Sequence, residues 1–276
     1  MILVTGGAGF IGSNLVHALV ARGESVVLVD DLSDGRKFKN IVSADIVDLY
    51  RMEDFYARLN AGDEPLDGIH AVFHQGACSD TTEWNGDYMM RVNYEHSKLL
   101  LEACTRRAVP FIYASSAAVY GSGMDFVEAR EFEHPINLYG YSKYLFDRHV
   151  LRRMNAPAAQ VVGLRYFNVY GPREAHKDRM ASVALHLHQQ IVDAGKVCLF
   201  AGSDGYADGE QRRDFIHVDD VVAVNLWLLD HPHCNGVFNV GTGRSHSFND
   251  VAKAVIDWHG GGELHYIPFP DDLVGR

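Results

Sequence analysis

The first twelve residues, MILVTGGAGFIG (1–12), contain the pattern that decides the fold. The apolar run Met1–Thr5 predicts a buried strand, which leads directly into a glycine-rich turn and a helix expected over Phe10–Ala21. The glycines fit both GxGxxG (positions 7, 9 and 12) and GxxGxxG (6, 9 and 12). Such glycines form a tight turn, let the backbone approach a pyrophosphate, and allow the helix to pack closely on the strand. The segment therefore predicts a dinucleotide-binding unit.

The chain continues from this segment as alternating strands and helices. Further β-rich runs lie at Ser25–Asp30, His70–His74, Pro110–Ala114 and Gln160–Arg165, and helical spacing is clearest at Phe10–Ala21, Tyr88–Arg107 and Tyr139–Met154. Strands that are apolar throughout and separated by helices predict a parallel sheet with both faces covered. We expect an α/β protein, with a Rossmann-type doubly wound parallel sheet over residues 1–170.

The alternation weakens after about Gly171. The segment Pro172–Arg213 is rich in charges, and a strand, a helix, a strand and a helix are expected after it, at Asp214–Val218, Asp219–Leu229, Val237–Val240 and Asn249–His259. This pattern predicts a smaller, mixed α/β C-terminal lobe over residues 171–276, interleaved with the last Rossmann elements. We expect that lobe to bind the substrate.

Composition excludes several classes of protein. The 276 residues include 25 Lys and Arg against 36 Asp and Glu, a net charge of −11. An acidic surface repels phosphate backbones and anionic lipids, so we expect neither a nucleic-acid nor a membrane partner. The four cysteines show no CxxC spacing, which favours free thiols in a reducing, cytoplasmic compartment. The HxH pairs at 186/188 and 231/233 offer too few donors for a metal site, and we interpret them as structural.

Acidic and basic residues follow the second predicted strand. Asp30 ends that strand, about 20 residues after the glycine turn, where a carboxylate binds a ribose 2′-hydroxyl. Asp30 and Asp31 favour NAD, because a carboxylate repels a 2′-phosphate. Arg36, Lys37 and Lys39 follow and could neutralise such a phosphate. The motif therefore leaves NAD and NADP open.

A second group of residues indicates acid–base chemistry. Tyr139 and Lys143 form YxxxK, with both side chains on one face of the predicted helix. A phenol titrates near pH 10 in water, so a tyrosine base needs a nearby ammonium to lower its pKa. Lys143 would do this and could also hold the nicotinamide ribose. The segment SSAAVYG (115–121) follows the strand that ends at Ala114, at the edge where open α/β sheets bind ligands.

These features together resemble the extended short-chain dehydrogenase/reductase family of nucleotide-sugar epimerases and dehydratases. The matching stretches occur in the family's order along essentially the whole chain: TGGAGFIGSN, FHQGACS, SSAAVYG, YGYSK, RYFNVYGP, RDFIHVDDV and FNVGTG. The resemblance implies a catalytic triad of Ser116, Tyr139 and Lys143. Ala117 and Ala118 stand where dehydratases of this group carry an Asp–Glu pair, so the sequence favours epimerisation.

Three further stretches, CSDTTEW (78–84), GPREAHK (171–177) and YIPFP (266–270), are similar to the branch of the family that epimerises C6 of ADP-heptoses for bacterial lipopolysaccharide. This resemblance implies bound NADP, with NAD as the alternative, an ADP-sugar substrate and a ring-like homo-oligomer, a pentamer. It also implies that Lys177 is a second acid/base residue, for which a phosphate contact is the alternative. Family members normally continue beyond a segment like this chain's end at Gly275 and Arg276, so we expect the substrate lobe to be truncated there.

The reaction itself requires a hydride acceptor. C6 of the heptose is not adjacent to a carbonyl, so its proton is not acidic and simple deprotonation cannot invert it. Transient oxidation to a 6-keto sugar, followed by return of the hydride to the other face, achieves the inversion. A second base is reasonable because the alcohol oxygen ends on the opposite side, and a lysine can act so if burial or nearby cations lower its pKa.

The site predictions can be stated residue by residue. The cofactor contacts expected are Gly6, Gly9, Phe10, Ile11, Gly12, Asp30, Asp31, Lys37, Gln75, Gly76, Ala77, Cys78, Ser79, Asn93, Lys143, Val169 and Lys177. The substrate contacts expected are Ser116, Asn168, Arg179, His186, Phe200, Ala201, Gly202, Ser203 and Arg213. The fork of Arg213 suits a diphosphate, and a surface ion pair with Asp214 or Asp219 is its alternative.

Two other functions stay open at this point. One is a UDP-hexose 4-epimerase, in which Lys177 has no assigned role. The other is a non-catalytic dinucleotide-binding sensor, because a fold alone does not establish a reaction. The intact Ser116, Tyr139 and Lys143 favour the enzyme, since a sensor has no need of a paired phenol and ammonium.

Overall fold

The chain folds into two compact units. The structure is a computed structural model that describes residues 1–63, 65–154, 159–203 and 205–270. The first unit comprises Met1–Tyr166 and Val218–Val240, and the second comprises Phe167–His217 and Gly241–Arg276. The chain therefore leaves the first unit after Tyr166, returns at Val218 and leaves again after Val240. The chain end at Gly275 and Arg276, where we expect truncation, lies outside the described residues.

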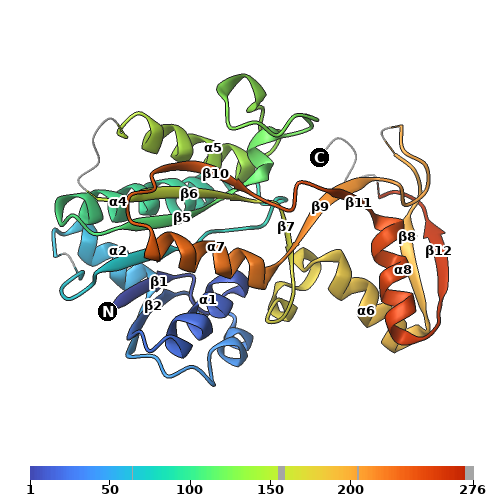
Figure 1. Cartoon of the computed structure of the whole chain (residues 1–276), viewed down its shortest axis with the longest axis horizontal. Coiled ribbons are helices and arrows are strands. Elements are labelled where there is room, and N and C mark those ends of the chain that lie inside the picture. The colour runs from blue at the N-terminus through green and yellow to red at the C-terminus, as the bar shows by residue number, and fades with distance from the viewer. Residues whose placement is uncertain (64, 155–158, 204, 271–276) are drawn as a thin grey trace. The chain divides into compact units, whose positions relative to one another are not determined.

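A seven-stranded sheet forms the centre of the first unit, in the order β10-β6-β5-β4-β1-β2-β3, and every neighbouring pair is parallel (Figure 1). Its strands are β1 (Ile2–Thr5), β2 (Val26–Asp30), β3 (Asp48–Arg51), β4 (Ala71–His74), β5 (Phe111–Ser116), β6 (Val161–Tyr166) and β10 (Gly236–Val240). Strands β1, β2, β4 and β6 are buried along their whole length, as their apolar runs predict. The predicted doubly wound parallel sheet is confirmed.

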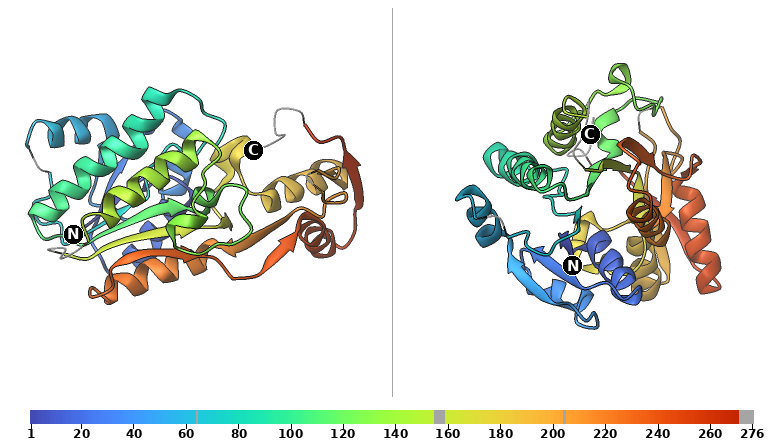
Figure 2. Two further views of the ribbon diagram at one scale, coloured as in Figure 1. Left: turned by 90° about the horizontal axis from the view of Figure 1, so that it is seen from above. Right: turned by 60° about the vertical axis from the view of Figure 1, so that its left-hand side comes forward.

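Helices cover both faces of this sheet (Figure 2). They are α1 (Phe10–Ala21), α2 (Met52–Asn60), α3 (Gly86–Met90), α4 (His96–Arg106), α5 (Leu138–Leu151) and α7 (Val218–Asp230), with single turns η1 (Gly35–Asn40), η2 (Arg91–Glu95), η3 (Ala117–Tyr120) and η4 (Arg130–Phe132). One core cluster joins alternate residues of β1, β2 and β4 to Phe55 of α2, Leu100 of α4 and Phe146 of α5. This core therefore packs one face of the sheet against three helices.

Two differences from the predicted elements have physical reasons. Strand β3 and helix α2 were not among the predicted elements. Strand β3 has no long apolar run because it is an edge strand with exposed ends at Asp48 and Arg51. The helix expected over Tyr88–Arg107 starts at Gly86, and its continuity is interrupted by η2, which is a π-helical turn. Such turns occur frequently at functional sites, and this one carries Asn93.

The second unit contains two small sheets. One has the order β11-β9-β7 and the other pairs β12 with β8. The elements are β7 (Asn168–Tyr170), η5 (Ala175–Met180), α6 (Val183–Ala194), β8 (Lys196–Phe200), β9 (Arg212–His217), β11 (Ser245–Ser247), α8 (Phe248–His259) and β12 (Glu263–Ile267). Helices α6 and α8 pack on β8 through a core that includes Leu187, Ile191, Val197 and Ala252. The segment in which the alternation weakens thus contains a regular helix and strand.

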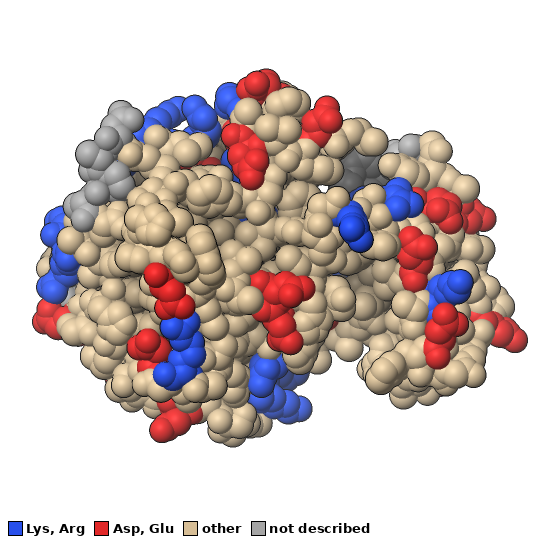
Figure 3. Space-filling view, in the orientation of Figure 1, with Lys and Arg blue, Asp and Glu red and all other residues tan. Residues whose placement is uncertain are grey.

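The cysteines are unpaired, and the drawn face of the surface carries charges of both signs. All four cysteines are free thiols. Across the described residues, no helix is both long and apolar enough to cross a membrane. On the face drawn in Figure 3, acidic and basic side chains are interspersed. Some form exposed ion pairs, such as Arg22 with Asp230 at 2.7 Å.

Candidate functional site

The glycine turn is packed so tightly that only glycine fits at two of its positions. A Cβ on Gly12 would lie 2.1 Å from the carbonyl oxygen of Gly6, and one on Gly6 would lie 2.7 Å from Cα of Gly76. Gly6 also has a φ of +65°, a conformation that favours glycine. The turn therefore lies directly against the segment that follows β4, and helix α1 begins one residue after Gly9. This is a backbone cradle at a helix N-terminus, which suits a pyrophosphate.

Asp30 and Asn40 hold the turn from behind. The Asp30 carboxylate accepts a hydrogen bond from Ala8 N at 2.7 Å, and the Asn40 amide donates to Ala8 O at 2.9 Å. The other carboxylate oxygen of Asp30 accepts from Asp31 N and from the Lys37 ammonium, at 2.7 and 2.8 Å. Asp30 is only 5% exposed. The prediction gave Asp30 one role, a ribose contact, whereas the structure uses both of its oxygens to support the turn.

The neighbouring charges are partly neutralised. Arg36 forms an ion pair with Asp34 at 2.9 Å, and Lys37 is paired with Asp30. Asp31 is exposed and accepts hydrogen bonds from the backbone N–H and hydroxyl of Ser33. Asp31 is therefore the more accessible of the two predicted carboxylates.

A buried histidine supports the segment Gln75–Ser79, which we call the strap. His74 Nδ1 lies 2.7 Å from the hydroxyl of Thr5, and Nε2 lies 2.8 Å from the hydroxyl of Ser97. Gly76 N in turn donates to the Thr5 hydroxyl at 3.1 Å. Burial lowers the pKa of His74 to about 3, with the Lys143 ammonium acting in the same direction. His74 is therefore a neutral bridge between two hydroxyls and the strap.

Asn93 clamps the strap to the helix that carries YxxxK. Its Oδ1 accepts from Cys78 N at 2.8 Å, and its Nδ2 donates to Cys78 O at 2.9 Å and to the Ser142 hydroxyl at 3.0 Å. The residue is 1% exposed. The structure pairs the Asn93 amide with protein groups of the strap and of α5, and the predicted cofactor contact at Asn93 stays a prediction.

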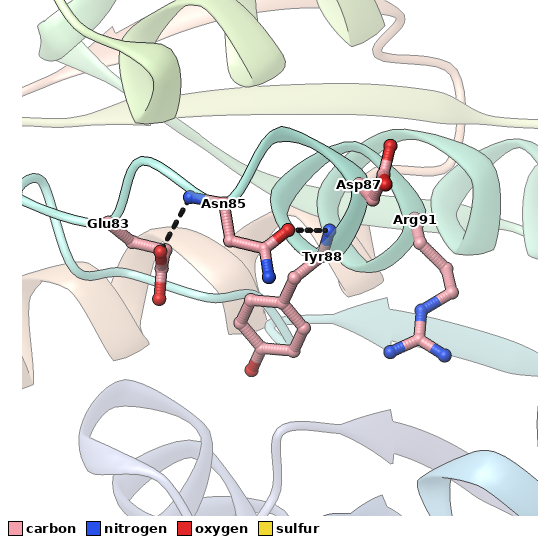
Figure 4. Close-up of a pocket in the computed structure, with 5 residues that line it drawn as sticks. All are labelled: Glu83, Asn85, Asp87, Tyr88 and Arg91. Atoms are coloured by element: carbon pink, nitrogen blue, oxygen red, sulfur yellow. Dashed lines mark hydrogen bonds between the residues drawn. The ribbon is translucent and has the colours of Figure 1, made fainter.

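An open pocket of about 460 Å³ lies beside the strap. Figure 4 shows its lining, in which Glu83 accepts a hydrogen bond from Asn85 N and Asn85 caps the helix turn at Tyr88 N. Burial raises the pKa of Tyr88, and the charges of Cys78 and Asp31 act in the same direction. Tyr88 therefore lies within electrostatic range of both Cys78 of the strap and Asp31.

The predicted triad comes together at the end of β5. Ser116 is the last residue of that strand, and its hydroxyl accepts from Ala118 N at 3.1 Å. Tyr139 and Lys143 lie one turn apart on α5, which starts with a cap from Asn137 to Gly140 N. The side chains of Ser116 and Tyr139 lie close enough for Ser116 to act on the pKa of the phenol. The Lys143 ammonium donates to Ala114 O at 2.9 Å, which ties α5 to β5.

Burial shifts the pKa values of Tyr139 and Lys143 in opposite directions. Burial raises the pKa of Tyr139, and the hydrogen bond from Ser116 opposes that rise. Burial lowers the pKa of Lys143 to about 8, and the negative charge of Asp147 opposes that fall. Burial is the largest influence on the phenol, so its pKa is raised, and the lowering of that pKa by Lys143 stays a prediction.

The predicted contacts of the second unit lie on its strands and on one pinned segment. Asn168 and Val169 are on β7, which pairs in parallel with β9. Arg213 is exposed on β9, opposite His246 of β11. Asp214, an alternative partner for Arg213, accepts from Thr242 N and Gly243 N, at 3.0 and 2.8 Å.

Lys177 and Arg179 flank a strained residue. Asp178 has a φ of +46° and Arg173 a φ of +71°, which is unusual for residues other than glycine. Such strain accumulates at functional sites. The buried Glu174 pins the segment, because its carboxylate accepts from Gly171 N at 3.1 Å and from the Ser182 hydroxyl at 2.7 Å. Burial lowers the pKa of Lys177, and the charge of Glu174 opposes it.

The remaining predicted substrate contacts lie in the turn after β8 and on helix α6. Phe200 ends β8, and Ala201–Ser203 begin the turn after it, in which Gly202 N donates to Asp208 at 2.8 Å. His186 lies on α6. His188, its partner in the HxH pair, faces His259 of α8 at 3.0 Å.

Sequence reasoning missed three positioning residues, which are Asn40, Glu174 and Asp147. Each is buried and binds partners that lie elsewhere in the sequence or in an irregular turn. In the sequence, such a residue can be recognised only as a polar side chain in a short turn or at a helix position expected to be buried.

Comparison with known proteins agrees with this geometry. The NAD dependent epimerase/dehydratase family matches residues 2–241. The chain belongs to that family. A curated ADP-L-glycero-D-manno-heptose-6-epimerase from Alkalilimnicola ehrlichii is 58% identical over 277 residues, which cover 100% of this chain and 86% of that protein.

Solved structures of this epimerase/dehydratase family superpose closely. The Helicobacter pylori ADP-L-glycero-D-manno-heptose-6-epimerase has a TM-score of 0.84 and 35% identity, covering 97% of this chain and 84% of that one. The Thermus thermophilus UDP-glucose 4-epimerase in complex with NAD has a TM-score of 0.81 and 29% identity, covering 99% and 87%. The glycine cradle and the strap of the first unit therefore have the form expected for a dinucleotide site in this epimerase/dehydratase family.

Proposed function

We propose that this chain interconverts ADP-D-glycero-D-manno-heptose and ADP-L-glycero-D-manno-heptose by inverting C6. The observation that carries the substrate assignment is the 58% identity over the whole chain to a heptose epimerase. Identity to the UDP-glucose 4-epimerases of Thermotoga maritima and Thermus thermophilus is only 31% and 29%. The UDP-hexose reading is therefore the weaker alternative.

The residues present fit a nicotinamide dinucleotide. Glycines that admit no Cβ form the turn of the cradle, the strap closes one side, and Lys143 lies fully buried on α5. Such a cofactor, when bound, supplies a reversible hydride acceptor and, when oxidised, a positive ring charge. The cofactor contacts proposed from the first unit are the glycine turn, Asp31, Lys37, the strap and Lys143, with Val169 and Lys177 from the second.

NADP is the proposed form of the cofactor. The basic run Arg36, Lys37 and Lys39 supports a 2′-phosphate, and Asp30 is already occupied by Ala8 and Lys37. NAD remains the alternative, because Asp31 is exposed at the same turn. Calorimetry with the nucleotide-free protein compares the dissociation constants of NADP and NAD. Tighter binding of NADP, with the difference largest at low salt, is expected if cations hold the 2′-phosphate.

The triad performs the proton chemistry of the proposed reaction. Tyr139 as phenolate takes the proton of the C6 hydroxyl while the hydride leaves C6, which gives the 6-keto sugar. Ser116, at the end of β5, donates its one hydroxyl proton to the sugar oxygen and holds that oxygen in line. The Lys143 ammonium stabilises the phenolate by its charge. Burial raises the pKa of Tyr139, so the reaction depends on positive charge near that phenol.

Lys177 is the proposed acid/base residue for the opposite face. Its lowered pKa favours proton exchange near neutral pH, and its segment is rigidly pinned through Glu174. Asn168, Arg179, His186, Phe200–Ser203 and Arg213 are the proposed substrate contacts, and Arg213 is assigned to the diphosphate. We further propose a cytoplasmic homo-oligomer, in line with the resembled family.

The test is turnover of two substrates. Purified protein is incubated with ADP-D-glycero-D-manno-heptose and, separately, with UDP-galactose, and NMR follows the products. We expect inversion of the heptose only. Inversion of UDP-galactose alone would overturn the heptose assignment, and bound nucleotide without turnover of either sugar would support the sensor. Lys177→Met is expected to lose most of the rate, and full activity of this variant would refute its acid/base role.

A further inference from the structure

Four buried charged side chains, one of them Lys143 of the triad, lie together, and the other three have no role in the proposed chemistry. Arg165 of β6 and Asp147 of α5 are 1% and 0% exposed, and Glu133 of the β5–α5 loop is 3% exposed. Lys143, 4% exposed, is the fourth. The two cations and two anions balance. Unpaired charges are costly inside a protein, so such a set indicates a built electrostatic arrangement.

Asp147 is the centre of this arrangement. Its Oδ2 accepts from the Ser115 hydroxyl and from Arg165 Nε, both at 2.9 Å, and its Oδ1 accepts from the Tyr113 hydroxyl at 2.9 Å. Three hydrogen bonds from two strands thus fix the carboxylate. Ser115 adjoins Ser116 of the triad, so the same bonds join α5 to the end of β5.

Arg165 is in turn held at its far end. Its Nη1 donates to the Tyr120 hydroxyl at 3.0 Å, and its Nη2 donates to Glu133 at 2.5 Å. The Tyr120 hydroxyl donates to Asn239 at 2.7 Å. Arg165 therefore shares its charge between two carboxylates. Because Arg165 also binds Glu133, it offsets only part of the negative charge of Asp147. The rest of that charge can act on another cation.

That cation is Lys143. Asp147 follows it by four residues, so the two side chains lie on one face of α5. The other titratable groups within electrostatic range of the ammonium are Cys78 of the strap and His74 of β4, and the latter is neutral. Among the described residues that act on the Lys143 ammonium, Asp147 is the carboxylate, and its hydrogen bonds hold it in place.

We propose that Asp147 is a positioning residue for the reaction, whose buried carboxylate keeps the ammonium of Lys143 charged inside the protein. Arg165 and Glu133 hold that carboxylate in place. The role rests on the proposed function, because a charged Lys143 serves the Tyr139 phenolate. Its electrostatic part can nevertheless be measured without any sugar substrate.

Asp147→Asn removes the charge and keeps an oxygen for Ser115. We expect the alkaline limb of the pH–kcat profile to move down by about one pH unit, since an opposite charge nearby shifts a pKa by one unit or more. The rate at pH 8 then falls about fivefold while the rate at pH 6 and KM change little. Glu131→Gln, which removes an exposed carboxylate two residues before Glu133, is the matched control and leaves the profile unchanged.

Lysine NMR provides the readout that is independent of turnover. Protein labelled with ¹³C at lysine Cε is titrated, and the Lys143 signal is assigned from its loss in Lys143→Arg. The Lys143 pKa is expected to fall in Asp147→Asn and to stay unchanged in Glu131→Gln. If heptose is not turned over but this shift appears, the proposed function fails and the electrostatic role stands.

Glu133→Gln keeps the proposal testable if Asp147→Asn does not fold. It removes the carboxylate that shares Arg165 with Asp147, so that Arg165 offsets more of the Asp147 charge, and a smaller shift of the Lys143 pKa in the same direction is expected. A Lys143 pKa that is the same as in the wild type in the folded variants, or an equal loss of kcat at every pH, would overturn the proposal.

Discussion

The two units present their predicted functional groups in opposite ways. In the first, Lys143 is buried and Tyr139 is half-buried, and the glycine turn and the strap are fixed by hydrogen bonds to Asp30, Asn40 and Asn93. In the second, Asn168, Arg179, Phe200 and Arg213 are exposed. Burial alters pKa values and restricts side-chain freedom. This contrast supports the proposal that the first unit is preorganised for proton and hydride chemistry and that the exposed residues of the second serve recognition. Lys177, whose pKa is lowered by burial, is the exception in the second unit.

Substitutions should separate the two units kinetically. Changes in the first are expected to lower kcat or cofactor affinity, because they alter fixed charges and close contacts. Changes at the exposed residues of the second are expected to raise KM, because they remove contacts that ground state and transition state share, whereas Lys177→Met is expected to lower kcat. The kinetic and stability effects of single substitutions test this difference between the units.

The largest effect is expected from Tyr139→Phe. Removing the phenol hydroxyl eliminates the proposed base, so kcat should fall by about 10²–10⁴ with little change in KM. Heptose epimerisation measured by NMR checks this, with circular dichroism to verify folding. Tyr141→Phe on the same helix is the control, since Tyr141 is 44% exposed, and its rate should be that of the wild type. A Tyr139→Phe enzyme with normal kcat would remove the contrast altogether.

Gly12→Ala tests the packing of the cradle. The added Cβ would lie 2.1 Å from Gly6 O, so the turn must shift, at a cost of about 1–3 kcal/mol in stability or in dinucleotide binding. Thermal unfolding and the ratio of bound nucleotide to protein measure the two effects. Gly35→Ala is the control, because a Cβ there meets no atom within 4 Å. Equal behaviour of the two variants would contradict the packing argument.

His74 makes the stability of the first unit depend on pH. The unfolded chain takes up a proton below about pH 6.5, but the folded protein resists it until about pH 3, so stability rises with pH between these values. From pH 7 to pH 5 this group should remove about 2 kcal/mol from the free energy of unfolding. Urea unfolding of His74→Gln should lack that loss, whereas His265→Gln, on exposed β12, should retain it. An equal pH dependence in all three proteins would exclude His74 as its source.

The smallest effect is expected from Arg213→Ala in the second unit. Loss of one charged hydrogen bond to a diphosphate costs about 1.4 kcal/mol, which raises KM about tenfold and leaves kcat within about twofold. Arg212→Ala is the matched control, since the Arg212 side chain binds Ser245 at 3.0 Å. Steady-state kinetics on the ADP-heptose decide the matter. A fall in kcat with KM unchanged would place Arg213 with the groups that act on the reacting atoms.

The sequence by itself determined the parallel sheet, the glycine cradle and the grouping of serine, tyrosine and lysine. Local patterns suffice for these features. An apolar run reports a strand buried on both faces, and a glycine turn between strand and helix reports a close backbone approach. YxxxK reports two side chains on one helical face. Strand β3 was missed because an edge strand needs no such run.

Only the tertiary structure decided how those groups are held and charged. Asp30 and Asn40 meet at Ala8, Asn93 meets Cys78 and Ser142, and Arg165 joins Asp147 to Glu133. These partners are separated by many residues, and any polar side chain in range could have served as well. The pKa values of Tyr139 and Lys143 depend on the same packing, because desolvation is a property of everything that surrounds a group and not of its neighbours in the chain.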